Sequence, residues 1–344
     1  MKIGLFWDQA IKINSYYVKD GCAYSFKTHT PYTYHHSLSS YCFTATHNYP
    51  FLWGDGCFIN ISEWDTFPDY ELDLIFYSCT RAGIDDATKS MYTVDRIRKK
   101  YPNAKIIGYT KESTVKPDRM LNWIEHFKEC DYIQAETGCD ISINTRPEII
   151  LQHHPELLEL EAQIGKQFNF VNQPINIDYF YNNVYTNEKI FGIFAYQPNP
   201  SYRHGNTYKF ANYIGNKYNI PVVYKSQYPE ICDNMVAPHI GFIKLFSQYL
   251  FHFNLDPATA HPGGQCCQIA NVGSINIGGN NESHFSLFPN TSGIDETELE
   301  KNFVELLNST DKQIETITYA FQKLNKLYSF DNVKSQIKKL YGVI

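Results

Sequence analysis

The feature that most constrains this sequence is a regular alternation, in which short apolar runs are followed by segments of helical periodicity along most of the 344 residues. Repeated strand–helix–strand units of this kind are typical of α/β folds with parallel sheets. In the first half, the expected strands are Lys2–Trp7, Leu72–Tyr77, Ala104–Tyr109, Tyr132–Ala135 and Phe168–Val171, and the expected helices are Ala87–Lys100 and Lys116–Cys130. The aromatic segment 15–70 interrupts the alternation, and we expect it to form irregular strands or loops laid over the first sheet.

A second α/β series follows a polar hinge. Its expected strands are Ile190–Tyr196, Ile220–Tyr224, Leu250–Asn254 and Ser274–Ile277, and its expected helices are Thr207–Tyr218, Pro238–Tyr249, Gln265–Val272 and Asp295–Asn308, followed by a mostly helical tail. The length also exceeds what one hydrophobic core usually organises. We therefore predict two Rossmann-like, doubly wound domains facing each other across a cleft. The expected parts are an N-terminal domain at 1–172, a hinge at 173–188, a C-terminal domain at 189–325, and a helix at 326–344 that crosses back to the N-terminal domain.

The composition argues against several classes of protein. A net charge of −6 leaves no large basic footprint for bulk binding of nucleic acid. The nine cysteines are odd in number and include no Cys-x-x-Cys, which favours reduced thiols in a cytoplasmic protein over disulfides or a zinc site. No apolar stretch reaches the ~18 residues of a membrane span, and the N-terminus lacks the pattern of a signal peptide, so no membrane insertion is expected.

Several common catalytic and nucleotide-binding motifs are absent. No G-x-G-x-x-G follows the first strand, and no G-x-x-x-x-G-K-[ST] occurs, which excludes the simple dinucleotide-binding and P-loop classes. The sequence also lacks G-x-S-x-G and H-E-x-x-H, so nothing points to a serine hydrolase of that type or to a zinc protease.

The segment HPGGQCCQIANVGSINIGG, residues 261–279, carries the strongest functional signal. It runs from a strand through His261 and the glycines Gly263 and Gly264 into a short helix beginning near Gln265. Glycines let the backbone approach a ligand closely, and the free N–H groups at a helix start bind anions. A diphosphate is the natural occupant; the simpler interpretation is an ordinary strand–turn–helix with a tight turn.

This segment resembles the donor-binding region of GT-B glycosyltransferases of the group 1 type. In that family an acidic residue on the helix contacts the donor ribose, and a glycine ending the helix leads into a strand. Placing Gly273 on that glycine puts Gln268 at the ribose-contacting position and Ala260 at the earlier acidic position, so this sequence departs from the family at both. Gln268 can still hydrogen-bond a hydroxyl, through a neutral and weaker contact than a carboxylate makes.

Two further segments support the resemblance. Residues 174–180, PINIDYF, look like the family's interdomain P-x-G-V-D-x-x-x-F element, with Asn176 in place of the glycine. The loop after the strand Ile190–Tyr196 contains Arg203 and Gly205, similar to the basic residue and glycine that hold the donor diphosphate in the family. Two more residues complete the expected donor site, namely Lys225, which follows a strand, and His239, which precedes a helix; an ordinary solvated or structural role is the alternative for both.

In GT-B enzymes the base that deprotonates the acceptor comes from a strand end of the N-terminal domain. The resemblance therefore makes Asp8, directly after the first strand, the leading catalytic candidate, with Glu136 at a later strand end as a weaker one. The alternative for Asp8 is a helix-capping role. The carboxylates between Asp69 and Asp73 are interpreted as a solvated strand entry, so we expect no metal and no cofactor besides the donor substrate.

The function implied by the resemblance is transfer of a sugar, without a metal, from a UDP-sugar or another nucleoside diphosphate sugar to an acceptor hydroxyl. The acceptor stays open between a glycan, a small molecule and a hydroxymethylated base in viral DNA; in the last case the protein would act in the host cytoplasm. The basic residues Arg96, Arg98–Lys100, Lys105, Lys111, Lys116 and Arg119 could line a DNA-facing surface, or simply be a solvated helix end and its neighbours. The alternatives to a transferase are a catalytically silent module that binds nucleotide sugars and a sugar-nucleotide epimerase of the same fold.

Overall fold

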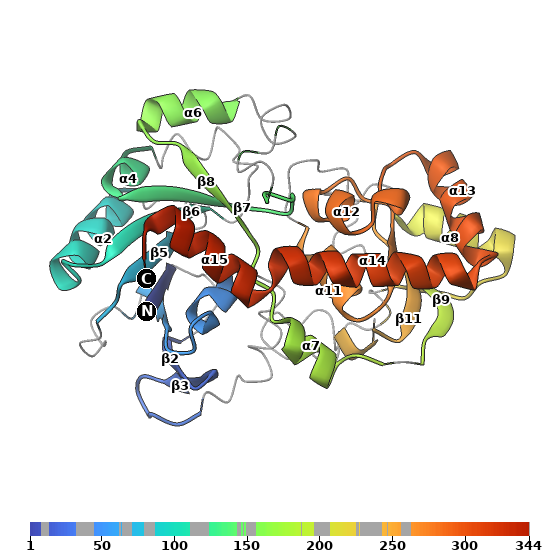
Figure 1. The fold of residues 1–344 in the computed structure, drawn as a ribbon, viewed down its shortest axis with the longest axis horizontal. Helices are drawn as coiled ribbons and strands as arrows, with labels where there is room; N and C mark the ends of the chain where they lie inside the picture. The colour runs from blue at the N-terminus through green and yellow to red at the C-terminus, as the bar shows by residue number, and fades with distance from the viewer. Residues whose placement is uncertain are drawn as a thin grey trace. The chain divides into compact units, whose positions relative to one another are not determined.

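The structure is a computed structural model. It describes residues 1–7, 14–31, 45–61, 63, 71–78, 87–110, 124–142, 146, 148, 156–186, 188–195, 207–224, 227, 243–245, 247–255 and 263–343. The chain divides into two compact units, each with its own sheet of wholly or mainly parallel strands (Figure 1). Unit 1 consists of Met1–Thr137, Ile141–Pro174 and Phe330–Ile344, and unit 2 consists of Gly138–Asp140 and Ile175–Ser329.

The sheet of unit 1 has eight strands in the order β3-β2-β4-β1-β5-β6-β7-β8. Their bounds are β1 Ile3–Trp7, β2 Tyr16–Lys19, β3 Cys22–Ser25, β4 Cys57–Asn60, β5 Leu74–Ser78, β6 Lys105–Thr110, β7 Tyr132–Thr137 and β8 Phe168–Asn172. The six strands from β4 to β8 in this order are parallel, and the β2–β3 hairpin joins β4 in antiparallel fashion. The helical elements described in this unit are η1 Ala45–Phe51, α2 Ala87–Lys100, α4 Ile124–Glu129, α6 Glu156–Ile164 and α15 Phe330–Tyr341.

The expectation for segment 15–70 is wrong for its strands. β2, β3 and β4 extend the sheet, because β4 pairs directly with β1 and β2, whereas η1 packs against the sheet through Tyr49. All four residues of β4 are buried, so this strand lacks the polar–apolar alternation by which a half-buried strand is recognised. The ring of Tyr16 on β2 stacks on that of Phe58 on β4 with centroids 5.2 Å apart, which explains part of the aromatic content of the segment.

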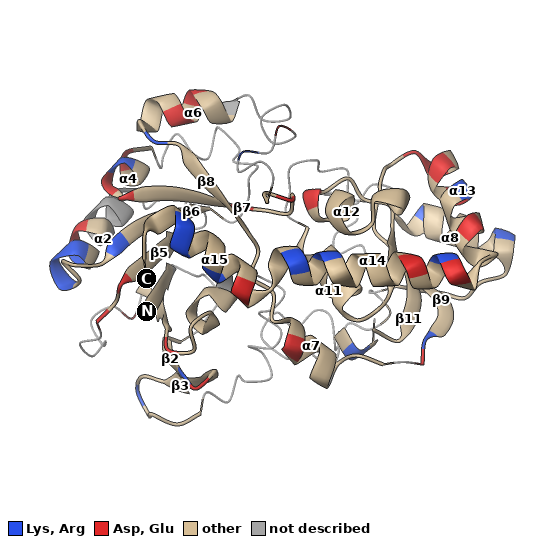
Figure 2. Ribbon diagram, in the orientation of Figure 1, with Lys and Arg blue, Asp and Glu red and all other residues tan. Residues whose placement is uncertain are grey.

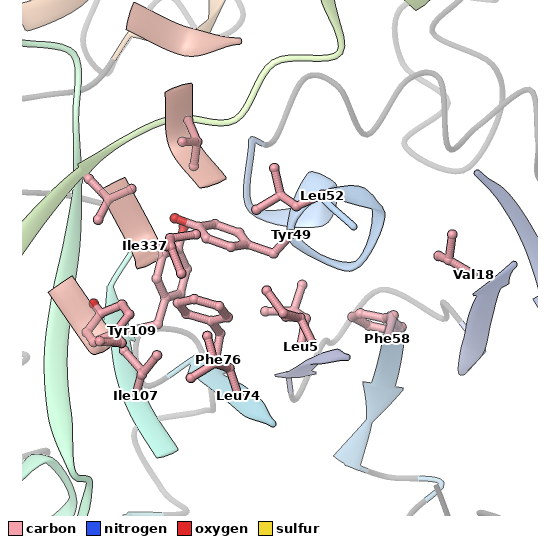
Figure 3. Close-up of a cluster of buried hydrophobic side chains, with 14 of the residues drawn as sticks. Leu5, Val18, Tyr49, Leu52, Phe58, Leu74, Phe76, Ile107, Tyr109 and Ile337 are labelled. Atoms are coloured by element: carbon pink, nitrogen blue, oxygen red, sulfur yellow. The ribbon is translucent and has the colours of Figure 1, made fainter. Parts of the chain in front are cut away.

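One hydrophobic core cluster of unit 1, with aromatic rings at its centre, lies between the sheet and α15 (Figure 3). The ring of Tyr49 lies 4.5 Å from that of Phe76 and 5.5 Å from that of Tyr109. The buried residues of α15 are Val333, Ile337 and Tyr341, spaced four apart on one helical face. This stripe explains why the end of the chain packs into unit 1 even though the residues before it belong to unit 2.

The sheet of unit 2 has four parallel strands in the order β10-β9-β11-β12. Their bounds are β9 Ile190–Ala195, β10 Val222–Tyr224, β11 Tyr249–Phe253 and β12 Ile275–Ile277. The helical elements described are α7 Ile177–Asn183, α8 Thr207–Tyr218, α11 Gly264–Asn271, α12 Glu282–Leu287, η6 Pro289–Thr291, α13 Glu296–Leu307 and α14 Thr310–Tyr328. Residues of α8 and α13 share one core cluster with the sheet, whereas Cys266 of α11 contacts Asn276 of β12 outside that cluster.

The predicted fold class is thus confirmed, since both units are α/β with parallel strands, and unit 2 is doubly wound. The bounds of α2 and α8 are those expected from the sequence. The expected helix Pro238–Tyr249 is wrong at its end, because Tyr249 already belongs to the buried strand β11. A short apolar strand that directly follows a helical turn has no sequence signal at the boundary.

Candidate functional site

Unit 2 has one place where its strand order reverses, between β9 and β11. From β9 the chain first adds β10 on one side, then crosses to add β11 and β12 on the other side. At such a switch point the two adjacent strands lead into connections that run to opposite sides of the sheet. This leaves a crevice beyond the carboxyl ends of the two strands. Here the strands end at Ala195 and Phe253, and the helices that follow them along the chain begin at Thr207 and Gly264.

Hydrogen bonds tie both helix starts to the end of β11. The backbone N–H of Leu255 donates to Thr207 Oγ1 over 3.0 Å, and Thr207 is fully buried at the first position of α8. The side chain of Asn254 donates through Nδ2 to Gln265 Oε1 over 3.2 Å. These contacts hold the first turns of α8 and α11 beside the switch point, where their free N–H groups offer an anion-binding site.

Gly263 is the N-cap residue of α11 and has no side chain to cap it. Its φ of +68° lies in the left-handed region, which other residues rarely adopt. A Cβ at this position would lie 2.0 Å from Oδ1 of Asn281, so the site also lacks room for any side chain. The backbone here therefore approaches its surroundings as closely as only glycine permits.

Gln268 is fully buried in the second turn of α11. Neither Oε1 nor Nε2 of its side chain has a hydrogen-bond partner among the described residues. Helical geometry places Gln268 on the same face as Gly264 and Gln265, four and three positions earlier, with its side chain leaning towards the helix start. A buried amide without partners costs about 1–3 kcal/mol, which a bound ligand can recover.

The wall behind α11 is polar and carries little charge. Asn276 Nδ2 lies 3.0 Å from Cys266 Sγ and 3.3 Å from His284 Nδ1. Burial lowers the pKa of His284 to about 3, so its ring is neutral near pH 7. The nearby carboxylate, Glu282, accepts a hydrogen bond from the backbone N–H of Gly138 over 2.7 Å.

The structure brings together four of the predicted donor-binding residues, because Gly263, Gly264, Gln265 and Gln268 all belong to the first two turns of α11 or to its cap. The other five predicted residues lie outside the described residues: Arg203, Gly205, Lys225, His239 and His261.

Sequence reasoning missed three residues of this edge, namely Thr207, Asn254 and Asn281. Thr207 and Asn281 each stand at the start of a helix, and Asn254 directly follows β11. A search for Asn and Thr at those positions could have found them.

In unit 1 the strand order reverses between β1 and β5. Asp8 follows Trp7, the last residue of β1, directly in the chain but lies outside the described residues. Glu136 is the penultimate residue of β7, which is separated from β1 by β5 and β6, or about 14 Å across the sheet. The sheet order therefore does not bring the two predicted catalytic residues side by side.

Glu136 is fully buried. After burial itself, its charge is the largest influence that raises the pKa of the Tyr49 phenol. Its surroundings are thus the core of unit 1, and its catalytic role stays a prediction.

Three residues of the predicted basic surface, Lys111, Lys116 and Arg119, lie outside the described residues. The described ones, around α2, lie at the edge of the sheet opposite to the carboxyl ends of the strands. Lys and Arg occupy the last turn of α2 (Figure 2), and Lys105 is the first residue of β6. Arg98 pairs with Asp131, directly before β7, over 3.0 Å. Because β6 has six residues, or about 20 Å, these cations are far from its carboxyl end and do not line an acceptor site there. These cations lie at or near the end of α2, where they complement the helix dipole and interact with neighbouring residues.

No protein-family model matches the chain, and no curated protein matches it in sequence. Solved structures are similar to it. An alpha-glucosyltransferase in complex with UDP-glucose and DNA containing an abasic site aligns over 100% of both chains with a TM-score of 0.60 and 11% identity. The trehalose-6-phosphate synthase OtsA aligns over 82% of this chain and 74% of its own with a TM-score of 0.55 and 10% identity.

The N-terminal domain of the Candida albicans trehalose-6-phosphate phosphatase aligns over 82% of this chain and 72% of its own, with a TM-score of 0.54 and 9% identity. The two parallel-sheet α/β units thus have the architecture of the GT-B glycosyltransferases. The chain has the GT-B fold over its full length. Among the described residues, no helix combines the length and the apolar character that crossing a bilayer requires.

Proposed function

We propose that this protein is a glycosyltransferase that transfers a sugar from a nucleoside diphosphate sugar, bound in unit 2, to an acceptor hydroxyl. A UDP-sugar is the first choice of donor, since a structurally similar alpha-glucosyltransferase was solved with UDP-glucose. The observation that carries the proposal is the buried, unpartnered amide of Gln268 beside the start of α11 at the switch point.

The donor's chemistry matches the groups at this edge. The N–H groups that follow Gly263 suit the diphosphate, because a helix start favours negative charge. The Gln268 side chain suits the ribose diol, since its oxygen accepts from one hydroxyl while its nitrogen donates to the other. We assign Arg203 and Gly205 to the loop that completes the diphosphate site, with His261, Lys225 and His239 around it. In this scheme helix dipoles and cations take the place of a metal.

For the acceptor we propose a hydroxymethylated base in DNA. Support comes from the similar alpha-glucosyltransferase, which aligns over the full length of both chains and was solved with DNA. We assign Asp8 to the acceptor side, where its carboxylate would take the hydroxyl proton if the reaction inverts the anomeric carbon.

Donor binding is tested by thermal unfolding in the presence of UDP-, GDP-, dTDP- and CDP-sugars. A ligand at a hundred times its dissociation constant adds about 2.7 kcal/mol, or roughly 5–11 °C in Tm for domains of this size. The Gln268→Met variant, which keeps the volume and removes both polar atoms, should lose most of this shift. No stabilisation by any of the four donors would refute the proposed function.

Transfer is tested with radiolabelled donor and duplex DNA that contains or lacks hydroxymethylated pyrimidines. Label should enter only the hydroxymethylated DNA, and Asp8→Asn should reduce transfer far more than donor binding. Donor binding without transfer to DNA, glycans or small hydroxyl compounds would instead indicate a silent binding module. Conversion of the donor's sugar in the absence of any acceptor would indicate an epimerase.

A further inference from the structure

Asn281 joins the starts of two helices at the proposed donor site. It is the N-cap of α12, where its Oδ1 accepts from the backbone N–H of His284 over 2.9 Å. The same oxygen accepts from the thiol of Cys266, in the first turn of α11, over 3.6 Å. The side chain also lies against Gly263, since a Cβ there would be 2.0 Å from Oδ1 and 3.0 Å from Nδ2. Asn281 therefore fixes the backbone from which the first N–H groups of α11 project.

The choice of asparagine at this position is informative. Asp and Asn are about equally good N-caps, and Asp adds a favourable interaction with the helix dipole. A carboxylate at Asn281, however, would place a negative charge in contact with the cap of α11. Two other polar side chains of this wall, Asn276 and His284, are also uncharged at neutral pH. The carboxylate of Glu282, the next residue, accepts a hydrogen bond from the backbone N–H of Gly138. An uncharged cap is the better choice if this helix start must bind an anion.

A second observation indicates a ligand at the same helix start. The unpartnered amide of Gln268 is fully buried and shares a face of α11 with its first turn. The helix start and the unsatisfied side chain thus point to one occupant.

We propose that Asn281 is a positioning residue for the donor diphosphate, and that its neutrality keeps a competing charge away from the start of α11. This inference rests on the proposed function of unit 2. It goes beyond that proposal because it assigns a role to Asn281, which lies seventeen or more positions after the two glycines. That role concerns the diphosphate and not the nucleoside.

The test compares Asn281→Asp with Asn281→Ser by isothermal titration. Serine is a neutral cap with a smaller side chain, so it is the control for lost packing, and aspartate adds charge while keeping the size. The probes are UDP, GDP, dTDP and CDP, each paired with its nucleoside. We expect Asn281→Asp to weaken the bound diphosphate at least about tenfold and Asn281→Ser no more than about threefold, with the nucleoside unaffected by either. Far-UV circular dichroism confirms that each variant is folded at the titration temperature.

Salt provides an independent readout. Because position 281 is buried, with 1% of its surface exposed, salt screens a charge there only weakly, so the tenfold loss in Asn281→Asp should persist as KCl is raised from about 50 to about 500 mM. Equal loss of nucleoside and diphosphate, a loss that disappears at the higher salt concentration, or a diphosphate affinity within about twofold of wild type would each overturn the inference. Failure of the wild-type protein to bind any of the four diphosphates would instead overturn the proposed function itself.

Discussion

Replacing Gly263 by alanine tests the geometry on which the donor site depends. The substitution has two effects. Residue 263 would keep a φ of +68°, which costs an L-residue about 1–2 kcal/mol. Its Cβ would also overlap Oδ1 of Asn281, so that side chain must move and give up its cap on α12, which costs about 0.5–2 kcal/mol. We therefore expect Gly263→Ala to lower the free energy of unfolding by about 2–4 kcal/mol.

Gly165→Ala is the matched control. Gly165 has a φ of +76°, and no atom lies within 4 Å of the position that a Cβ would take, so only the backbone cost applies there. The Asn281→Ala background separates the two effects further, because it removes the atoms with which alanine 263 would collide. In that background Gly263→Ala should cost about 0.5–2 kcal/mol less than in the wild type, which is a coupling typical of residues in contact.

The sequence dictates the probe for these measurements. The four tryptophans, Trp7, Trp53, Trp64 and Trp123, all belong to the residue range of unit 1. Their fluorescence therefore follows unit 1, whereas far-UV circular dichroism also follows the helices of unit 2. Gly263→Ala should shift the circular dichroism transition more than the fluorescence transition, and Gly165→Ala should do the reverse. If Gly263→Ala costs no more than Gly165→Ala, or the cost is the same in both Asn281 backgrounds, the close contact does not exist.

Three further outcomes are expected. Gln268→Met should raise the free energy of unfolding of the ligand-free protein by about 1 kcal/mol, since it removes an unpartnered buried amide; a destabilised variant in chemical denaturation would contradict this. Burial lowers the pKa of His126 to about 3, so on acidification the unfolded chain takes up a proton before the folded protein does. The free energy of unfolding should therefore fall by up to about 1.4 kcal/mol per pH unit between about pH 6.5 and pH 3. His126→Phe should make the unfolding free energy measurably less dependent on pH across this window, and an unchanged slope would refute the argument. Arg203→Ala should abolish the thermal shift by nucleotide sugars, and a retained shift would remove Arg203 from the diphosphate site.

The elements that the sequence predicted best are those with a long periodic signal. Helices α2 and α8 have the expected bounds because each presents an apolar face over at least three turns. Strand β4 was missed because four consecutive buried residues carry no alternation. The same limit explains the late start expected for β11, which follows a helical turn without a break in the pattern.

The candidate site divides along a similar line. Gly263 was found because two adjacent glycines between a strand and a helix are a local signal. Asn281 has the residue type of a helix N-cap, but its contact with Gly263 is made across the fold, and the sequence carries no signal for that contact. The lack of partners for Gln268 likewise depends on which polar groups the fold brings near, and that is a property of packing, which no single sequence displays.

The structure also changes what the substitution at Gln268 implies. On the sequence alone, an amide in place of the family's carboxylate weakens the case for a donor site. In the structure, the same edge is built from further neutral groups, among them Asn254, Asn276 and Asn281. A carboxylate at position 268 would be fully buried, and its desolvation would cost far more than that of an amide. A neutral amide satisfies a diol with one accepted and one donated hydrogen bond and adds no repulsion towards the diphosphate. The amide of Gln268, in place of the family's carboxylate, therefore fits its neutral surroundings, and we interpret it as support for a donor site.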